Sequence, residues 1–492
     1  MMLKLFAILP FFIAYINALP LINSNNGPQK AYNQLIGTQE EIFQYLGGQA
    51  PYLSFIDDYG ISTDLPSDQC QLEQVQLLAR HGERFPSTGV GATLSKLYYK
   101  FSNYTASNEL TGSLSFMNDY DFFIYDNSQL EMLTNDTNSA TTENPYIGSR
   151  DAENLGAEFR NKYGSLISDN QTFLPVFSSS SDRVYQTALQ FTQAFLSANH
   201  STPNLQGHVY ILAENASMGA NQLTPVQACT PFNTSANADL LAQYDSQYLQ
   251  DIADRLNSGN SGLGLTSQDA LNLFTWCAYE INVNGYSDMC NVMTKDEFVR
   301  YSYYQDLGNY YEWDAGYYLN KAVGSVLFNN SINLLKTPPE TDNNVWAGFT
   351  HDTDIESFLS VAGLFTESKN LSLTNVEFKD HSYKRTAMTP MGARIILEKF
   401  SCPSTSNNTD YSNSTSTTSY VRYVVNDAVI PIETCSYGPG FSCPIDDFYT
   451  YAEQQLGDVD YVSECVIPEG APTQPTFFWD YATKNYTSSL NF

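Results

Sequence analysis

The 492-residue chain has no run of about 18 consecutive apolar residues, the length that a helix needs to cross a membrane. Its longest nearly apolar stretch, residues 5–16, follows Lys4 and leads to Asn17 and the small residue Ala18. A basic start, a short apolar segment and a small residue at its end are typical of a secretory signal peptide. We therefore predict that residues 1–18 are removed. Residues 19–492 should be a secreted protein with no membrane partner, either extracellular or kept in the cell wall or periplasmic space.

Basic residues are scarce. The sequence has 23 Lys and Arg against 53 Asp and Glu, a formal net charge of −30. Such an excess of negative charge argues against nucleic acid or an anionic membrane surface as a partner. Acid would protonate part of the carboxylates, so this composition favours a protein that works at low pH.

Metal-binding cysteine and histidine patterns are also missing. The eight cysteines contain no CxxC pair and the five histidines form no cluster, so we expect no zinc site and no metal or other cofactor. An even number of cysteines in an oxidising compartment favours four disulfides. Spacing favours Cys277–Cys290 and Cys435–Cys443 as local pairs and leaves the pairing of the other four open.

The sequence is rich in Asn-x-Ser/Thr sequons. Together with a signal peptide, they predict glycosylated positions on the surface. The sequons are at Asn103, Asn135, Asn170, Asn199, Asn215, Asn233, Asn329, Asn370, Asn407, Asn413 and Asn485.

Short apolar runs alternate with helical patterns and indicate an α/β fold. We predict strands at 75–79, 174–177, 345–350, 392–400 and 420–426, in a mainly parallel central sheet flanked by helices. Residues 103–170 and 226–335 show helical spacing and almost no strand signal, and we assign them to a smaller α-helical subdomain inserted over the site. The α/β core then comprises about 66–102, 171–225 and 336–492. Residues 19–50 should be an arm that packs on the domain or on a second subunit of a homo-oligomer.

The first predicted strand is followed directly by residues 80–86, which read Arg-His-Gly-Glu-Arg-Phe-Pro. We call these residues the 80–86 motif. Gly82 permits a sharp turn and close approach to a ligand. Arg80 and Arg84 place two forked, permanently charged donors around the imidazole of His81, a geometry that suits phosphate oxygens. His81 can act as a nucleophile, provided that the arginine charges disfavour its imidazolium form in acid.

Two later strand ends carry further polar groups. The second predicted strand leads to Arg183 at a helix start, and the third leads to His351 and Asp352. Ligand sites of open α/β sheets gather at the carboxyl ends of strands, so we expect the three junctions to converge. Cleavage of a phosphate ester also needs an acid that gives a proton to the leaving oxygen, and Asp352 could supply it. Asp354 is a rival for this role, although it also suits a helix N-cap.

The 80–86 motif closely resembles the signature of the histidine acid phosphatases, the branch of the two-histidine phosphatases that includes fungal acid phosphatases and phytases. The resemblance covers nearly the whole mature chain and is strongest to the secreted yeast acid phosphatases. It implies that residues 19–492 are one catalytic domain that hydrolyses phosphate monoesters through a phosphohistidine.

The resemblance also implies roles for individual residues. His81 matches the nucleophile and Asp352 the proton donor, while Arg80, Arg84, Arg183 and His351 match the phosphate-binding residues. Glu83 occupies a variable position, and we expect it to be a buried partner for an arginine. His200, His208 and His381 are expected to be structural or at the surface. The implied long-range disulfides are Cys70–Cys402 and Cys229–Cys465.

Four alternatives are weighed at this point. A mutase or a sugar-bisphosphatase is permitted by the Arg-His-Gly core alone, but secretion removes the usual cytoplasmic substrates. A phytase would share these catalytic residues and line its pocket with more basic residues, but Lys96, Lys100, Lys295 and Arg300 are too sparse to decide. An inactive cell-wall glycoprotein would share the signal peptide, sequons and acidity. A metal-dependent phosphatase would need several Asp and His ligands, and no such cluster exists beyond 351–354.

Overall fold

The computed structural model describes residues 39–55, 60–139, 144–198, 204–376, 382–403 and 417–491. Several sequence predictions fall outside these ranges, namely the signal peptide at 1–18 and the sequons at Asn199, Asn407 and Asn413. His200 and His381 also lie outside them.

One sheet of nine strands forms the centre of the described structure, in the order β7-β6-β5-β1-β4-β2-β3-β9 with β8 beside β6. The middle strands β1, β4, β2 and β3 are parallel, whereas β5, β6, β7 and β9 are antiparallel to their neighbours. The predicted α/β fold is therefore confirmed, with the parallel strands at the centre of the sheet. The strands are β1 (Gln71–Arg80), β2 (Phe173–Ser179), β3 (Gln206–Leu212), β4 (Val345–Thr350), β5 (Arg394–Pro403), β6 (Thr417–Val425), β7 (Ala428–Ile430), β8 (Cys443–Pro444) and β9 (Thr487–Asn491).

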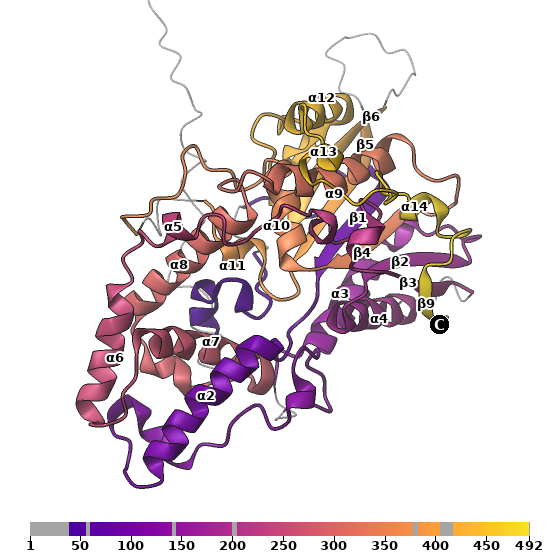
Figure 1. The fold of residues 1–492 in the computed structure, drawn as a ribbon. Helices are drawn as coiled ribbons and strands as arrows, with labels where there is room; N and C mark the ends of the chain where they lie inside the picture. The colour runs from indigo at the N-terminus through magenta and orange to yellow at the C-terminus, as the bar shows by residue number, and fades with distance from the viewer. Residues whose placement is uncertain are drawn as a thin grey trace, which may run out of the picture.

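Helices cover both faces of the sheet (Figure 1). On one face, α3 (Gly148–Tyr163) and α4 (Asp182–Ser197) pack on alternate β1 residues such as Val75 and Leu77. On the other lie α9 (Asn320–Lys336), α10 (Asp352–Val361) and α12 (Ile445–Leu456), and the Gln76 amide donates to the Ser331 carbonyl of α9 at 3.0 Å. The remaining short helices of the core are α11 (Arg385–Met388), α13 (Tyr461–Glu464) and α14 (Phe477–Asp480).

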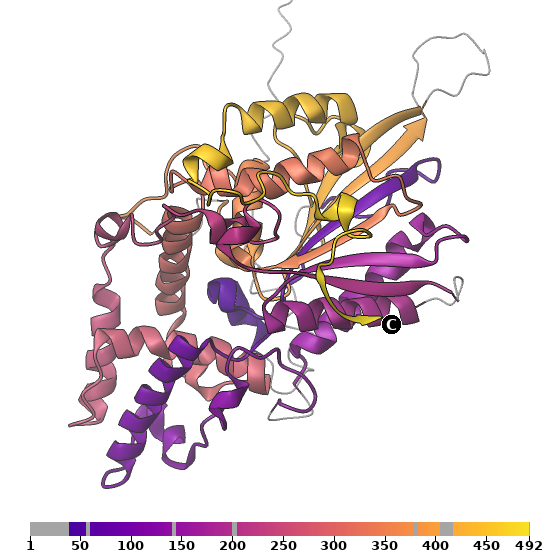
Figure 2. The same ribbon diagram turned by 45° about the vertical axis from the view of Figure 1, so that its right-hand side comes forward.

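A group of helices extends from one end of the sheet, and Figure 2 shows it as a separate lobe of the same chain. Its centre is α7, which packs against α2, α6 and α8. Capping boxes start α7 and α8, where Thr266 pairs with Asp269 and Thr294 with Glu297. The helices of this lobe are α2 (Thr88–Thr105), α5 (Ala238–Leu241), α6 (Gln247–Gly259), α7 (Ser267–Asn284) and α8 (Lys295–Trp313).

The lobe differs in extent from the predicted helical subdomain of 103–170 and 226–335. Helix α3 packs along α4 and the sheet through Leu155, Phe159 and Tyr163, and α9 packs along α10. Both helices therefore lie with the core, whereas α2, which was predicted mostly in the core, packs in the lobe. Helical spacing identifies a buried face but does not say which element that face meets.

The described part of the N-terminal arm, residues 39–50, folds onto its own chain. A 3₁₀ helix at Glu40–Tyr45 places Phe43 edge-on against Tyr146, with ring centroids 4.9 Å apart, and Tyr45 near Phe298 of α8. The arm then runs to Gly48, whose carbonyl accepts a hydrogen bond from Arg80. Residues 39–50 of the arm therefore pack on the domain itself, whereas residues 19–38 lie outside the described ranges and packing on a second subunit stays a prediction.

Four disulfides join the eight cysteines. The local pairs Cys277–Cys290 and Cys435–Cys443 are those that spacing favoured, and Cys70–Cys402 and Cys229–Cys465 are those that the family resemblance implied. Cys70–Cys402 links the start of the core to β5 across 332 residues of sequence.

The sequons within the described ranges lie at the surface. Seven of them are exposed, at Asn103, Asn170, Asn215, Asn233, Asn329, Asn370 and Asn485, and Asn135 is half-buried. Among the described helices, none has both the length and the apolar character to span a membrane.

Buried carboxyl groups give the fold a pH dependence. Glu280 of α7 is 4% exposed and accepts hydrogen bonds from Ser287, Tyr120 and Trp276. Burial outweighs these bonds and raises the pKa of Glu280 to about 7, and burial likewise raises the pKa of Asp314 to about 7. Both groups are therefore protonated in the folded protein in acid, whereas in the unfolded chain they ionise near pH 4. Their contribution to stability is full below about pH 4 and is lost as the pH rises through about 7.

We expect a higher melting temperature near pH 4.5 than near pH 7.5, because buried acids must ionise at the higher pH and the net charge of −30 also becomes fully expressed. Glu280→Gln should reduce the difference by up to about 3 kcal/mol in the free energy of unfolding. Glu340→Gln, at an exposed position, should leave the difference unchanged. Thermal unfolding at both pH values measures this, and equal melting temperatures for the parent protein would contradict it.

Candidate active site

The three predicted strand ends lie side by side. In the parallel pair β1 and β4, Arg80 is level with Thr350, and Ser178 of β2 is level with Phe349. His81 directly follows β1. Arg183 lies in the first turn of α4, the helix that follows β2. His351 directly follows β4, and α10 begins with Asp352. The expected convergence at the carboxyl ends of the strands is therefore present.

His81 is fixed at the centre of this edge and is 1% exposed. Its backbone N–H donates to the Thr350 carbonyl at 3.2 Å, and its Nδ1 lies 2.9 Å from the Gly82 carbonyl oxygen. A carbonyl oxygen only accepts, so we assign the ring proton to Nδ1, which leaves the lone pair on Nε2. Burial, followed by the charges of Arg80 and Arg84, holds the pKa of His81 well below its usual value, so the ring stays neutral in acid.

Gly82 allows two segments to meet behind the histidine. A Cβ at this position would lie 2.7 Å from the Gly148 carbonyl oxygen at the start of α3, closer than side-chain atoms tolerate. The Gly82 N–H donates to Thr187 Oγ1 of α4 at 3.1 Å. Glycine is therefore required here by close backbone approach.

The arginines of the 80–86 motif are held by different partners. Arg80 is 2% exposed; its Nη1 donates to the carbonyls of Thr389, at 2.7 Å, and Gly48, and its Nη2 lies 3.0 Å from Oδ2 of Asp352. The Arg84 guanidinium lies 5.6 Å from the ring centroid of Tyr279, a helical-lobe residue, and Nη1 donates to the Phe85 carbonyl at 2.9 Å. The lobe thus contributes to the site through an aromatic contact.

Arg183 and His351 are neighbours, with Arg183 Nη2 3.5 Å from His351 Nδ1, and the rings of His351 and His81 are 5.8 Å apart. Arg80, Arg84 and Arg183 surround His81 with positive charge, and His351 lies beside them. The Nε–H groups of Arg80, Arg84 and Arg183 are all buried without a hydrogen-bond partner within the described structure. An anion bound here could accept from guanidinium donors that the protein leaves unused.

Asp352 lies between guanidiniums. Arg80 Nη2 and Arg385 Nη2 are 3.0 and 3.2 Å from Oδ2. Burial alone would raise the pKa of Asp352, but the charges of Arg80 and Arg385 outweigh it and hold this pKa well below its usual value. The rival carboxyl Asp354 is turned to Thr350, whose hydroxyl donates to Asp354 Oδ2 at 2.8 Å, and burial raises its pKa. Asp352, not Asp354, therefore contacts the arginines of the site.

Three residues of this neighbourhood were not predicted. Glu214, two residues after β3, lies 3.2 Å from His351 Nε2, and Glu131 pairs with Arg183 at 3.0 Å. Arg385 contacts Asp352 as described above. The expectation that ligand groups gather at the carboxyl ends of strands would have pointed to Glu214 if β3 had been predicted. The start of β3, Gln206-Gly207-His208, gave no strand signal. Neither Glu131 nor Arg385 follows a strand, so no sequence rule pointed to them.

Glu83 corrects another expectation. It is 1% exposed, but its Oε1 accepts from the backbone N–H of Tyr52 at 2.7 Å, and no arginine forms an ion pair with it in the described structure. Burial, then the nearby charge of Asp151, raises the pKa of Glu83 to about 8, so it is neutral in acid. Glu83 joins the 80–86 motif to Tyr52, just after the N-terminal arm.

Two of the basic residues considered for a phytate pocket are already paired. Lys100 contacts Asp269 at 2.5 Å, and Arg300 contacts Asp296 at 2.9 Å. No group of three or more His, Cys, Asp or Glu side chains in the described ranges is arranged to hold a metal ion. The positive charge near His81 comes from arginines.

Comparisons with known proteins match this arrangement. The family model of the histidine phosphatase superfamily (branch 2) matches residues 71–426. The constitutive acid phosphatase of Saccharomyces cerevisiae is 47% identical over 457 residues, which cover 92% of this chain and 93% of the relative. A phytase of Candida albicans is 42% identical over 463 residues, covering 94% of each chain.

A solved structure shows the same fold. The phytase from D. castellii superposes with a TM-score of 0.83 at 42% sequence identity, covering 94% of this chain and 96% of the other. The family resemblance of the 80–86 motif is thereby confirmed over nearly the whole chain. The chain belongs to branch 2 of the histidine phosphatase superfamily.

Proposed function

We propose that the chain is a secreted acid phosphatase that hydrolyses phosphate monoesters through a phosphohistidine at His81. The observation that carries the proposal is a buried, neutral His81 surrounded by Arg80, Arg84, Arg183 and His351, with its Nε2 lone pair unprotonated. A nucleophile within a cradle of guanidiniums is what in-line phosphoryl transfer requires. The acid phosphatases among the relatives support the same activity.

The first step forms a covalent intermediate. Nε2 of His81 attacks phosphorus, the P–N bond forms as the bond to the ester oxygen breaks, and Asp352 gives its proton to the leaving alkoxide. Arg80, Arg84 and Arg183 neutralise the charge on the three equatorial oxygens. In the second step water attacks phosphorus, Asp352 takes up a proton of that water, and the P–N bond breaks to release inorganic phosphate and restore His81.

Substrate binding prepares Asp352 for its role. Without an anion, Arg80 and Arg385 keep the pKa of Asp352 low. A bound phosphate monoester brings negative charge to Arg80 and close to Asp352, which offsets the effect of the arginines on Asp352 and raises its pKa. Acid favours the protonated form further. The excess of carboxylates over the whole chain is also partly neutralised in acid, which reduces repulsion of an anionic substrate.

A phytase is the second candidate, favoured by the match to the D. castellii phytase and the C. albicans relative. The surroundings of Arg183 favour a simpler ester as the main substrate. Glu131 and Glu214 lie beside the phosphate-binding residues, while Lys100 and Arg300 are paired elsewhere. Carboxylates next to the bound phosphate should repel the additional phosphates of phytate.

We further propose that residues 19–492 form a single catalytic domain that is glycosylated outside the cell, in the medium, wall or periplasmic space. The four disulfides and seven exposed sequons support an oxidising, extracellular setting. The possible homo-oligomer stays a prediction.

The proposal is tested by measuring phosphate release from phytate and from a panel of simple monoesters between about pH 3 and 8, with a chelator present. We expect broad turnover of monoesters in acid that the chelator does not reduce. A strong preference for phytate would favour the phytase. No turnover of any ester would favour an inactive wall glycoprotein, and turnover that returns only with added metal would overturn the mechanism.

A further inference from the structure

Arg385 is a fourth guanidinium at the site, supplied by a segment far from the 80–86 motif. It is the first residue of the short helix α11 and is 21% exposed. Its Nη2 lies 3.2 Å from Oδ2 of Asp352, and Arg80 Nη2 lies 3.0 Å from that same oxygen. One carboxylate oxygen therefore accepts from two guanidiniums.

The position of Arg385 is fixed from several sides. Its backbone N–H donates to Asp306 Oδ1 at 2.8 Å, and its Nη1 donates to Gln305 Oε1 at 3.3 Å. On another side the arm passes so closely that a Cβ at Gly48 would lie 2.9 Å from Arg385 Nε. The guanidinium is thus held between α8 and the N-terminal arm.

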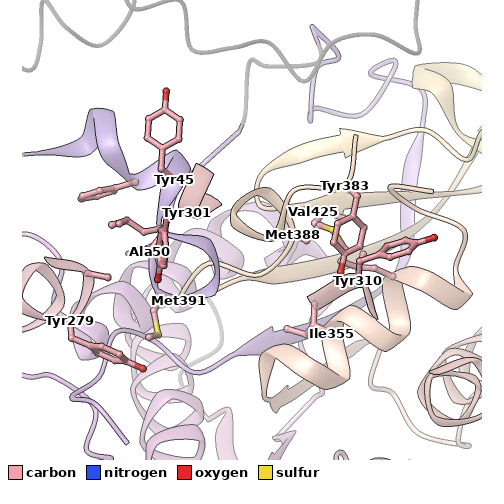
Figure 3. Packing of buried hydrophobic residues seen from close by; sticks show 14 of the residues in the cluster. Tyr45, Ala50, Tyr279, Tyr301, Tyr310, Ile355, Tyr383, Met388, Met391 and Val425 are labelled. Atoms are coloured by element: carbon pink, nitrogen blue, oxygen red, sulfur yellow. The ribbon is translucent and has the colours of Figure 1, made fainter. Parts of the chain in front are cut away.

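The residues before α11 are also anchored on α8. The ring of Tyr383 packs edge-on against Tyr310, with centroids 5.3 Å apart, and its hydroxyl accepts from the Asn309 amide at 2.5 Å. Figure 3 shows Tyr383 and Tyr310 next to each other, with Met388 of α11 close by. A side chain held this firmly can define the orientation of its partner.

We propose that Arg385 is a positioning residue for the proton donor: with Arg80 it engages Oδ2 of Asp352, so that Oδ1 is the oxygen that carries and delivers the proton. The inference rests on the proposed function and adds a residue to it. Both guanidiniums are donors only, so an Oδ2 shared between them is the poorer place for a proton.

Arg385 also contributes charge to Asp352, and its removal should raise the pKa of that carboxyl. Its other carboxylate neighbour, Glu356, lies 3.5 Å from Arg385 Nε, and burial raises the pKa of Glu356 to about 8, so in acid Glu356 is neutral and does not compete. The charged or titratable groups that face Asp352 are Arg80, Arg84, Arg183, His351, Asp354, Glu356 and Arg385, and those that face Arg385 are also Tyr301, Asp306, Glu312 and Tyr383.

Two variants separate charge from geometry. They are compared by kcat on glycerol 2-phosphate and on p-nitrophenyl phosphate between about pH 3 and 8, because the pH dependence of kcat reports ionisations in the enzyme–substrate complex. For Arg385→Gln on the alkyl ester, we expect the alkaline limb of the pH–rate profile to move up by about one pH unit. The maximum of the same profile should fall about tenfold. The aryl ester, whose leaving group needs little proton assistance, should fall less than about threefold. The ionisation of the substrate is common to all the enzymes and cancels in the comparison.

Arg385→Lys keeps the charge but lacks the forked donors of the guanidinium. We expect the alkaline limb of its pH–rate profile to stay at the parent position and its rate to fall several-fold on the alkyl ester only. Arg300→Gln removes a guanidinium paired with Asp296 at the surface and should match the parent enzyme. Inhibition by inorganic phosphate should change less than about threefold in both Arg385 variants, because Arg385 acts on Asp352 and not on phosphate.

An unmoved limb in Arg385→Gln would overturn the inference, as would phosphate inhibition weakened tenfold or more, which would make Arg385 a phosphate-binding residue. If Arg385→Gln does not fold, a lysine variant equal to the parent on both esters would overturn it instead. A parent enzyme inactive on both esters would overturn the proposed function itself, whereas an active parent with an unmoved limb overturns only the role of Arg385.

Discussion

His81→Ala is expected to lower phosphate release by at least about 10⁴-fold on every monoester, because no other group of the site can form the covalent intermediate. The substitution removes a buried ring whose pKa is depressed, so the folded protein loses no charge in acid. Initial rates in acid, with an alkyl and an aryl ester, measure the effect.

His208 provides the matched control. It lies on β3 near the start of the strand, at the opposite end of the sheet from His81, and is similarly buried. His208→Asn should retain most of the activity of the parent. A His81→Ala protein that folds and still releases phosphate at more than a tenth of the parent rate would show that His81 is not the nucleophile.

Asp352→Asn is expected to slow hydrolysis of alkyl monoesters by about 10²–10⁴-fold, the usual contribution of a general acid. An aryl ester with a stable phenolate leaving group should lose about tenfold or less, because its bond to phosphorus breaks without a proton. The ratio of the two rates therefore reports the role of Asp352 more directly than either rate. Measurement of kcat/KM for both esters near pH 4.5 provides the ratio.

Asp354→Asn is the control for this change. Asp354 is a buried carboxyl of the same helix whose pKa is raised, so an amide replaces a group that is already neutral in acid. We expect the ratio of alkyl to aryl rates to stay at the parent value. Equal losses on both esters in Asp352→Asn, or a changed ratio in Asp354→Asn, would remove Asp352 from the role of acid.

Residues close to strand ends were the part of the site that the sequence could predict. Three apolar runs, each followed by a polar turn and a helical pattern, were enough to expect that the 80–86 motif, Arg183 and His351 with Asp352 converge. The rule needs only local patterns and the parallel arrangement of the strands. It failed at Glu214 because β3 begins with Gln, Gly and His, which obscure a strand only seven residues long.

Arg385 and Glu131 show why the remainder could not be predicted. Glu131 reaches the site from an irregular segment and Arg385 from a helix of only four residues, and in both tertiary packing, not local propensity, sets the backbone path. Arg385 depends on α11, a helix of four residues held by the contacts of Tyr383 with α8. The depressed pKa of His81 was expected from the arginines, but the structure adds burial as its largest cause, and burial is a property of the whole fold.

Trapping the covalent intermediate tests the central claim most directly. The enzyme would be mixed with a monoester in acid, quenched with alkaline denaturant, in which phosphohistidine survives, and digested for mass spectrometry. We predict one added phosphoryl group on the peptide that contains His81, and none in His81→Ala. Rapid turnover with no phosphorylated peptide, or a phosphoryl group on a different residue, would contradict the account.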